Sequence, residues 1–418
     1  MDLVTQCIVN GWRRVAFIGT AKHAGKTTAL NAFIARAGQA RFQSPAGPLH
    51  SALPRSPADR STRPGAVSTL GLLSVGLDGE RLDTILGVSK PAIEAPSGTI
   101  IASAERALAD SDAELEYLAA LPIESPLGTV LVARVQRAGR VVLAGIRQRH
   151  HVELAAPALE QAGADLVLID GAFDRVAAAA PDLVDAVVIA VGAIHGRTVE
   201  DAARHAFLLL QKFRLPEIPA DLKAALQPAR EQDVGGVLIA SAAAEAPCAY
   251  PRGALPPCAY PPGPFPRGGI SPGASPSEPS HAALTLVPGR GVSDFVRCLE
   301  SAAPSLACAS AHQPSITCYV PGAVTTTLLE ALARCGVMHL VAAHPAQILA
   351  SAEAIARWFR RGHRLSVWRR VPIAAIAVNP HSITGYDLPS EPLQDAIRQI
   401  APGIPVINAK EWMRVAQS

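Results

Sequence analysis

The amino-acid sequence predicts an α/β fold whose mostly parallel sheet carries helices on both faces. Short, continuous apolar runs alternate with helical segments along the chain. Hydrophobic residues make up 49% of the 418 residues and aromatic residues only 4%, so we expect a core of small aliphatic side chains. Near the N-terminus, an apolar run ends in glycine and passes into a helical segment. Strands of a parallel sheet covered on both faces have such continuous apolar runs.

The elements follow from this alternation. In the first half we expect strands at 14–18, 68–75, 129–135, 141–144, 166–169 and 186–191, and helices at 27–37, 102–109, 112–120, 151–162 and 199–213. The strands 129–135 and 141–144 could form a hairpin, with Ala138-Gly139 at the turn. In the second half we expect strands at 316–320, 339–342, 373–378 and 405–408, and helices at 325–334, 346–360 and 392–400.

Composition excludes several classes of protein. The net charge of +3 is small for this length and does not indicate a nucleic-acid-binding surface. A membrane-spanning helix needs about 20 apolar residues, and every apolar stretch of this sequence is much shorter. Residues 1–12 do not resemble a signal peptide, so we expect a cytoplasmic protein. The seven cysteines contain no C-x-x-C pair, which indicates neither a disulfide framework nor a zinc site.

The segment 15–30 reads VAFIGTAKHAGKTTAL, which is the strand, glycine-bearing loop and helix of a P-loop. Glycines allow the backbone to wrap around phosphate oxygens, and the helix N-terminus supplies partial positive charge. Lys26 is expected to reach the β- and γ-phosphates, and the Thr27 hydroxyl to bind Mg²⁺. Thr20 stands at the first glycine position of the usual pattern, with Gly19 one residue earlier. The residues expected to bind the nucleotide are Gly19, Thr20, Lys22, Ala24, Gly25, Lys26, Thr27 and Thr28.

Two roles remain open for Lys22, a second lysine that faces the phosphates or a solvated surface residue. The form Gly-Thr-x4-Gly-Lys-Thr is similar to the loops of dethiobiotin synthetase and the cobyrinate amide synthases, in the P-loop class that includes the ParA-like ATPases. This similarity implies a P-loop NTPase fold, and a homodimer is common among such proteins.

Carboxylates at strand ends are the candidate magnesium ligands. Asp170 follows the apolar run 166–169, at the sheet edge where open α/β sheets bind their ligands. Asp78 follows strand 68–75 and is a candidate to hold magnesium or position the attacking water, with a plain surface turn as the alternative. Asp174 and Arg175 are equally compatible with the site or with a surface turn.

Three further segments are candidates for the surroundings of the site. Lys90-Pro91 and Gly98-Thr99 could border it, and Asn379, at the end of strand 373–378, could read the nucleotide base. We interpret His150-His151 and the other histidines as ordinary surface or core residues, because their spacing does not suit a metal site.

Two stretches interrupt the folded pattern. Residues 40–66 are rich in Pro, Ser, Gly and Arg, and residues 247–279 are richer still in Pro and Gly. We therefore expect a P-loop nucleotide-binding domain at 1–243 with an insertion at 40–66, a disordered linker at 244–283, and a C-terminal α/β portion at 284–418. That portion could be a separate domain or could complete the first sheet.

Several of these segments together resemble the P-loop subunit of the lysine 5,6-aminomutase reactivase family. The resemblance covers most of residues 12–242 and, more loosely, 314–418. It is carried by Gly19-Thr20-x4-Gly25-Lys26-Thr27-Thr28, residues 71–80, Lys90-Pro91, IDGAFDR at 169–175, Val191-Gly192-Ala193 and Val378-Asn379-Pro380. It implies a nucleotide-driven chaperone that restores an inactivated cobalamin-dependent mutase, together with a second reactivase subunit.

Three functions are compatible with the sequence. The first is hydrolysis of a nucleoside triphosphate that drives a conformational change in a partner enzyme. The second is a dethiobiotin synthetase-like, ATP-dependent ligase, and the third is a scaffold that binds a nucleotide without hydrolysing it. No Asn-Lys-x-Asp motif for guanine is present, which favours ATP over GTP as the substrate.

Overall fold

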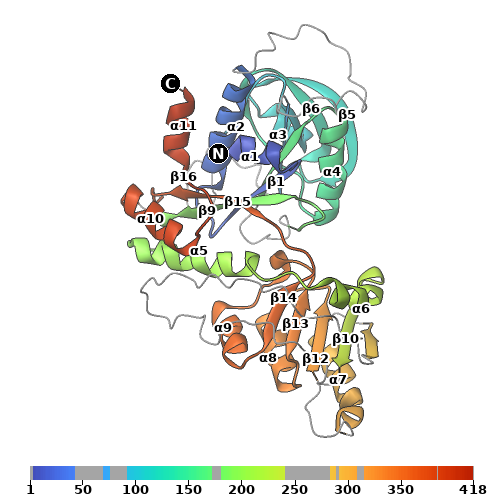
Figure 1. Ribbon diagram of the computed structural model, residues 1–418. Coiled ribbons are helices and arrows are strands. Elements are labelled where there is room, and N and C mark those ends of the chain that lie inside the picture. The colour runs from blue at the N-terminus through green and yellow to red at the C-terminus, as the bar shows by residue number, and fades with distance from the viewer. Residues whose placement is uncertain are drawn as a thin grey trace. The chain divides into compact units, whose positions relative to one another are not determined.

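The computed structural model describes residues 3–42, 69–75, 92–171, 180–240, 283–288, 291–307, 315–383 and 385–417. The chain divides into two units. The first comprises Met1–Leu210 together with Val371–Ser418, and the second comprises Gln211–Arg370 (Figure 1). The second unit is therefore inserted into the first.

The first unit contains a nine-stranded sheet in the order β16-β15-β9-β1-β8-β2-β4-β6-β5. Only β6 runs antiparallel to its neighbours, and the other pairs are parallel. The strands are β1 (Arg14–Gly19), β2 (Leu70–Val75), β4 (Ile100–Ala104), β5 (Glu114–Ser125), β6 (Gly128–Arg137), β8 (Leu166–Gly171), β9 (Ala186–Gly192), β15 (Ile373–Asn379) and β16 (Val406–Asn408). This arrangement confirms the predicted α/β class with a largely parallel sheet.

Helices cover both faces of this sheet. On one face, α1 (Leu3–Val9), α2 (Lys26–Phe42) and α11 (Ala409–Gln417) form a core with side chains such as Phe17 and Leu168 (Figure 1). On the other face, Leu159 of α4 (Arg149–Gln161) lies against Gly71, where an added Cβ would come within 3.4 Å of it. The unit also contains α3 (Glu105–Ala109), α5 (Val199–Phe213), α10 (Ser390–Ile400) and a small antiparallel pair of β3 (Ile93–Ala95) and β7 (Gly139–Val141).

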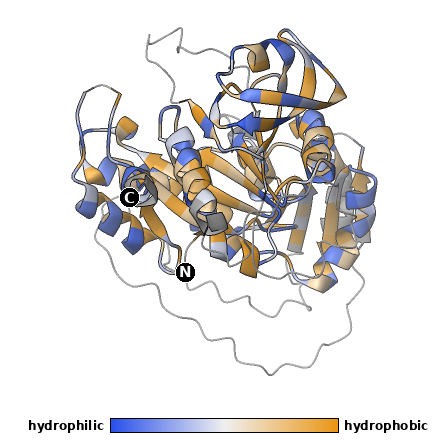
Figure 2. Cartoon of the chain, turned by 90° about the horizontal axis from the view of Figure 1, so that it is seen from above, coloured by the Kyte–Doolittle hydropathy of each residue, from blue (hydrophilic) through white to orange (hydrophobic). Residues whose placement is uncertain are grey.

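The second unit has its own five-stranded sheet, in the order β11-β10-β12-β13-β14. Its strands are β10 (Gly235–Ala240), β11 (Ala283–Val287), β12 (Ser315–Val320), β13 (His339–Ala342) and β14 (Arg364–Val367). Buried side chains of α7 (Val292–Ala307), α8 (Thr326–Arg334) and α9 (Ala352–Arg360) form one core, and those of α6 (Ala220–Glu231) form another. Hydrophobic residues follow many of the strands, and hydrophilic residues are frequent on the helices (Figure 2).

Some predicted elements are wrong. The segment 112–120 is not a helix: from Glu114 onward it is the first part of β5, which pairs with β6. This long-range pairing overrides the helix propensity of its Leu, Ala and Glu residues. The helix expected at 102–109 is β4 followed by α3, and the predicted hairpin of 129–135 with 141–144 does not form, because β6 pairs with β4 and β5. The helix expected at 346–360 begins only at α9, where the Ser351 hydroxyl accepts a hydrogen bond from the Ala354 amide.

The predicted domain boundaries also need correction. The first domain does not end at 243, because α6 and β10 belong to the second unit. The part of the C-terminal portion from Val371 onward completes the first sheet through β15 and β16. Most of the expected insertion at 40–66 and of the expected linker at 244–283 lies outside the described residues.

Candidate functional site

The loop between β1 and α2 is held in place by the neighbouring strand β9. Thr20 is buried; its amide donates a hydrogen bond to the Ala190 carbonyl over 3.0 Å, and its hydroxyl donates to the same oxygen over 3.3 Å. The loop then turns through two residues with positive φ, His23 at 62° and Gly25 at 95°. Thr20 therefore anchors the start of the loop, and its hydroxyl faces the protein.

Close contacts surround two of the glycines in this segment. A Cβ atom at Gly19 would lie 3.0 Å from Lys26 Cγ and 3.2 Å from Lys26 Cδ, so the aliphatic stem of Lys26 crosses over the end of β1. A Cβ atom at Gly25 would lie 2.6 Å from Cβ of Asn379. Gly25 therefore requires glycine for the loop to keep this path, whereas a side chain at Gly19 would require the Lys26 stem to shift by a few tenths of an ångström.

The end of β9 supports the loop from beneath. A Cβ atom at Gly192 would lie 2.8 Å from Cα of Ala24, which is fully buried. In the sequence, Gly192 stood out only within a family motif, although a glycine at the end of an apolar strand can indicate a close backbone approach.

The helix that follows the loop presents its N-terminus to the same place. Its first intrahelical hydrogen bond runs from the Ala29 amide to the Gly25 carbonyl over 2.9 Å. The amides of Lys26, Thr27 and Thr28 precede that bond, and α2 has no acidic residue in its first turn. These amides and the helix dipole create a positive potential at the loop, which favours an anion.

Asp170 is brought to this helix by strand register. Residues in register on adjacent parallel strands point to the same face, and Asp170 is aligned with Phe17 of β1 and Ser74 of β2. The ring of Phe17 packs edge-to-face against Phe33 of α2, with ring centroids 5.9 Å apart. The Asp170 carboxylate therefore lies on the face covered by α2, at the sheet edge from which the loop leaves β1.

A second loop of the first unit follows β9 and is tied to the loop after β15. The Tyr386 hydroxyl lies within hydrogen-bond distance of the Ala193 and Gly196 carbonyls and can donate to one of them at a time. Its ring lies 5.6 Å below the Arg197 guanidinium carbon. Nothing in the sequence indicated this role for Tyr386. Tyr386 and Ala193 are separated by 193 positions in the sequence and are brought together by the pairing of β9 with β15.

Two histidines stack beside this second loop. The rings of His195 and His205 are nearly parallel, with centroids 4.0 Å apart, and His205 Nδ1 donates to the Asp201 carbonyl over 2.9 Å. Burial, together with the nearby His205, lowers the pKa of His195 to about 4. His195 is therefore neutral near pH 7.

The structure places the predicted site residues as follows. It brings together Gly19, Thr20, Ala24, Gly25, Lys26, Thr27, Thr28 and Asn379 at the loop, and Asp170 at the same sheet edge. The amide of Asn379 donates to the His381 carbonyl over 3.3 Å, and Lys22 is exposed on the loop. Asp78, Asp174, Arg175 and Lys90-Pro91 lie outside the described residues.

One predicted border of the site is wrong. Gly98 and Thr99 precede β4, which runs parallel to β2 and hence to β1. They lie at the amino ends of the strands, whereas the loop leaves the carboxyl end of β1. Thr99 is completely buried there, so it belongs to the core.

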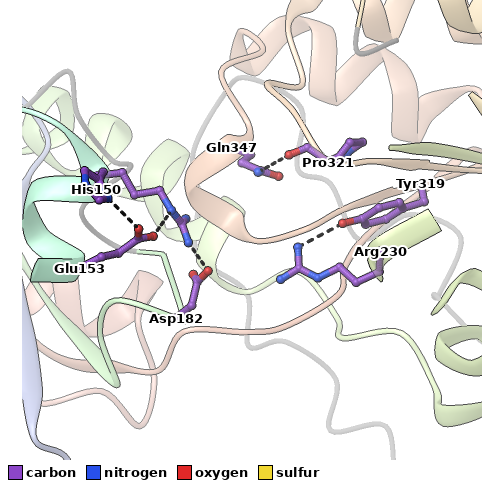
Figure 3. A network of polar contacts seen from close by, with 8 residues as sticks. His150, Glu153, Asp182, Arg230, Tyr319, Pro321 and Gln347 are labelled. Atoms are coloured by element: carbon purple, nitrogen blue, oxygen red, sulfur yellow. Dashed lines mark hydrogen bonds and ion pairs between the residues drawn. The ribbon is translucent and has the colours of Figure 1, made fainter. Parts of the chain in front are cut away.

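Other polar networks have structural roles. Arg149 contacts Asp182 and Glu153 at the start of α4, and in the second unit Arg230 donates to the Tyr319 hydroxyl over 3.2 Å (Figure 3). Within the described parts of the chain, no group of three His, Cys, Asp or Glu side chains could hold a metal ion by itself, and none of the helices described there could span a bilayer.

Comparison of the chain with protein-family models, with curated proteins and with solved structures found no match. The loop geometry is consequently the strongest guide to function.

Proposed function

We propose that the loop between β1 and α2 binds a magnesium–nucleoside triphosphate and that the protein hydrolyses it. The observation that carries this proposal is the cradle itself, where Gly25 has a positive φ, the Lys26 stem crosses Gly19, and Asp170 lies on the same face as α2. A concave backbone with glycines, first-turn amides and one lysine is complementary to a chain of phosphate oxygens.

Each residue of the site has a proposed role. The amides of Lys26, Thr27 and Thr28 would contact phosphate oxygens, and the Lys26 ammonium would approach the β- and γ-phosphates. The Thr27 hydroxyl and the Asp170 carboxylate would hold magnesium, with the phosphates providing further ligands, so no cluster of acidic side chains is needed. Magnesium, when bound, would neutralise the charge that develops on the transferred phosphate. Asp78 remains a candidate to position water, and Asn379 one to contact the base.

The route of the chain favours a conformational switch over a small-molecule ligase. The inserted unit leaves the first unit through α5, after β9, and returns into β15. These two strands end in Gly192 and Asn379, the residues that contact the loop at Ala24 and Gly25. Release of the γ-phosphate from the loop would therefore act first on the two strands to which the inserted unit is joined. The proposed partner is a cobalamin-dependent mutase, as the family resemblance implies.

The decisive test measures nucleotide affinity and phosphate release for the full chain with Mg²⁺ and ATP or GTP. Lys26→Ala should weaken binding on the order of 10- to 100-fold, because a charge-assisted contact of about 1.5–3 kcal/mol is removed. Asp170→Asn should retain much of the binding and lose turnover. Lys410→Ala, which removes an exposed lysine elsewhere in the same unit, should change neither.

Unchanged affinity in Lys26→Ala would remove the assignment of the loop. Binding without phosphate release in the unsubstituted protein would favour a non-hydrolysing scaffold. Stimulation of hydrolysis by a cobalamin-dependent mutase would support the switch, whereas stimulation only by a small carboxylate substrate would support a ligase. Lys22→Ala separates the two roles of Lys22, because only a phosphate-facing lysine would contribute to affinity.

A further inference from the structure

A pocket between α8 and α9 of the second unit combines an apolar floor with a basic rim. Its floor is formed by Leu329, Ala354 and Trp358, whose side chains are nearly completely buried. The indole of Trp358 is fixed, since its Nε1 donates to the Arg364 carbonyl over 3.0 Å. The remaining lining residues are Glu330, Ala333, Arg334, Arg357 and Arg361.

We propose that this pocket binds an acidic side chain of a partner peptide. Three exposed arginines surround it, and one acidic residue, Glu330, lines it. Glu330 already accepts a hydrogen bond from Arg357 over 2.6 Å. Neither Arg334 nor Arg361 has an acidic side chain within ion-pair distance among the residues that the structure describes. The rim therefore offers two guanidinium groups to a carboxylate, which they can bind with paired hydrogen bonds.

Stabilisation of the helix C-termini is an alternative reason for these arginines, but it does not explain why they border a pocket. Arg334 ends α8 and Arg361 follows α9, where a positive charge compensates the helix dipole. A dipole effect needs no concave surface, whereas here both arginines border a recess with Trp358 at its floor. Two further carboxylates lie in the region without lining the pocket. Glu353 interacts with Ser351 in the first turn of α9 and with Arg357, and the charge of Glu300 acts on Cys335, the residue after Arg334.

The size of the pocket favours a peptide side chain over a free small molecule. It is an open recess with a volume of about 170 Å³, whereas small-molecule sites usually have volumes of about 300–1,000 Å³. An aspartate or glutamate side chain fits the smaller volume, with adjacent apolar residues of the peptide lying over the floor. Arginine and tryptophan are also the residues that most often dominate binding between proteins. This inference concerns the second unit and does not depend on the proposed nucleotide site.

The test uses the full chain and a fluorescein-labelled peptide in which Glu alternates with Leu, at physiological ionic strength. Fluorescence anisotropy should report saturable binding, and the same peptide with Gln in place of Glu should bind at least about tenfold more weakly. Arg334→Ala and Arg361→Ala should each weaken binding by about tenfold. Arg360→Ala is the matched control, because it removes an exposed arginine of α9 that does not line the pocket, and it should change affinity by less than about twofold.

Four results would overturn the inference. Equal binding of the Gln peptide, or absence of binding, would exclude recognition of a carboxylate. An equal loss of affinity in Arg360→Ala would show that the peptide is attracted by the general positive charge of this surface and not by the pocket. Complete displacement by millimolar inorganic phosphate would identify a site for small anions instead. Because all substituted arginines are exposed, unchanged circular dichroism of each variant should verify that the fold is intact.

Discussion

Gly25 links the conformation of the loop between β1 and α2 to the end of β15. Its φ of 95° is one that residues with a side chain rarely adopt, and a Cβ there would come within 2.6 Å of Asn379 Cβ. The same residue thus provides the turn before α2 and the close approach of Asn379.

We expect Gly25→Ala to destabilise the protein by more than the strain of a positive φ alone, which is about 1–3 kcal/mol. Gly98→Ala is the matched control, since Gly98 has a φ of 83° but no atom within 4 Å of an added Cβ. Chemical denaturation should give a larger loss for Gly25→Ala, accompanied by weaker nucleotide binding. Equal losses in the two variants would contradict the tight contact with Asn379.

His195 is expected to make stability depend on pH. Its pKa falls from 6.5 to about 4 on folding, so between these values the unfolded chain binds more protons than the folded chain. The stabilising contribution of neutral His195 is therefore complete above about pH 6.5 and is lost as the pH falls toward 4.

Urea denaturation between pH 7 and pH 4 should show this decline, and His195→Gln should reduce it. His150→Gln is a suitable control because that imidazole is exposed. A decline of the same size in His195→Gln would assign the pH dependence to other groups. Titration of the His195 ring resonances near pH 4 would provide direct support.

At the scale of elements, β1 is fixed at the end opposite to the loop. The Asp185 carboxylate accepts hydrogen bonds from the Arg13 and Arg14 amides over 2.8 and 3.0 Å. The Arg14 guanidinium forms two hydrogen bonds with Glu160 of α4, over 2.7 and 3.0 Å. The strand that precedes this loop is thereby tied to β9 and to the helix on the opposite face from α2.

Asp185→Ala should accordingly lower the free energy of unfolding by about 1–3 kcal/mol, because two backbone amides lose a charged acceptor. Asp182→Ala removes a carboxylate three residues away, in an exposed contact with Arg149, and should cost less than about 1 kcal/mol. Denaturant titration of both variants measures the difference. If Asp182→Ala cost as much as Asp185→Ala, the anchoring of β1 would not depend on these bonds.

At the scale of the whole molecule, the two units have separate hydrophobic cores. Phe33 is buried in the core of the first unit and Phe295 in that of the second, and each is completely inaccessible to solvent. Separate cores allow the two units to unfold in separate transitions.

Scanning calorimetry of the full chain should therefore resolve two unfolding transitions. Addition of magnesium and nucleotide should raise the midpoint temperature of only one of them. Phe33→Ala should lower the nucleotide-sensitive transition, and Phe295→Ala the other, each by about 3–5 kcal/mol of unfolding free energy. A single transition that responds to both substitutions and to nucleotide would instead indicate that the two units unfold together.

The α/β class and most of the parallel strands are visible in local sequence patterns, because continuous apolar runs such as those of β8 and β9 indicate strands that are buried on both faces. The sequence also located the loop from Gly19 to Thr28, since glycines, lysine and helix start are consecutive. It predicted Asp170 at the correct sheet edge, because a polar residue that ends an apolar strand is visible in one segment. The roles of these residues in nucleotide binding remain predictions.

Features that depend on pairing between distant segments could not be predicted from local patterns. The strand β5 contains helix-forming residues and is a strand because it pairs with β6. Gly98-Thr99 was predicted at the wrong edge of the sheet, because the direction of a strand within a sheet is not visible in the local sequence. The return of the chain into β15 places Asn379 against Gly25, across 354 residues of sequence (379 − 25). Local patterns report burial and turns, whereas strand order, domain insertion and such contacts follow from the packing of the whole chain.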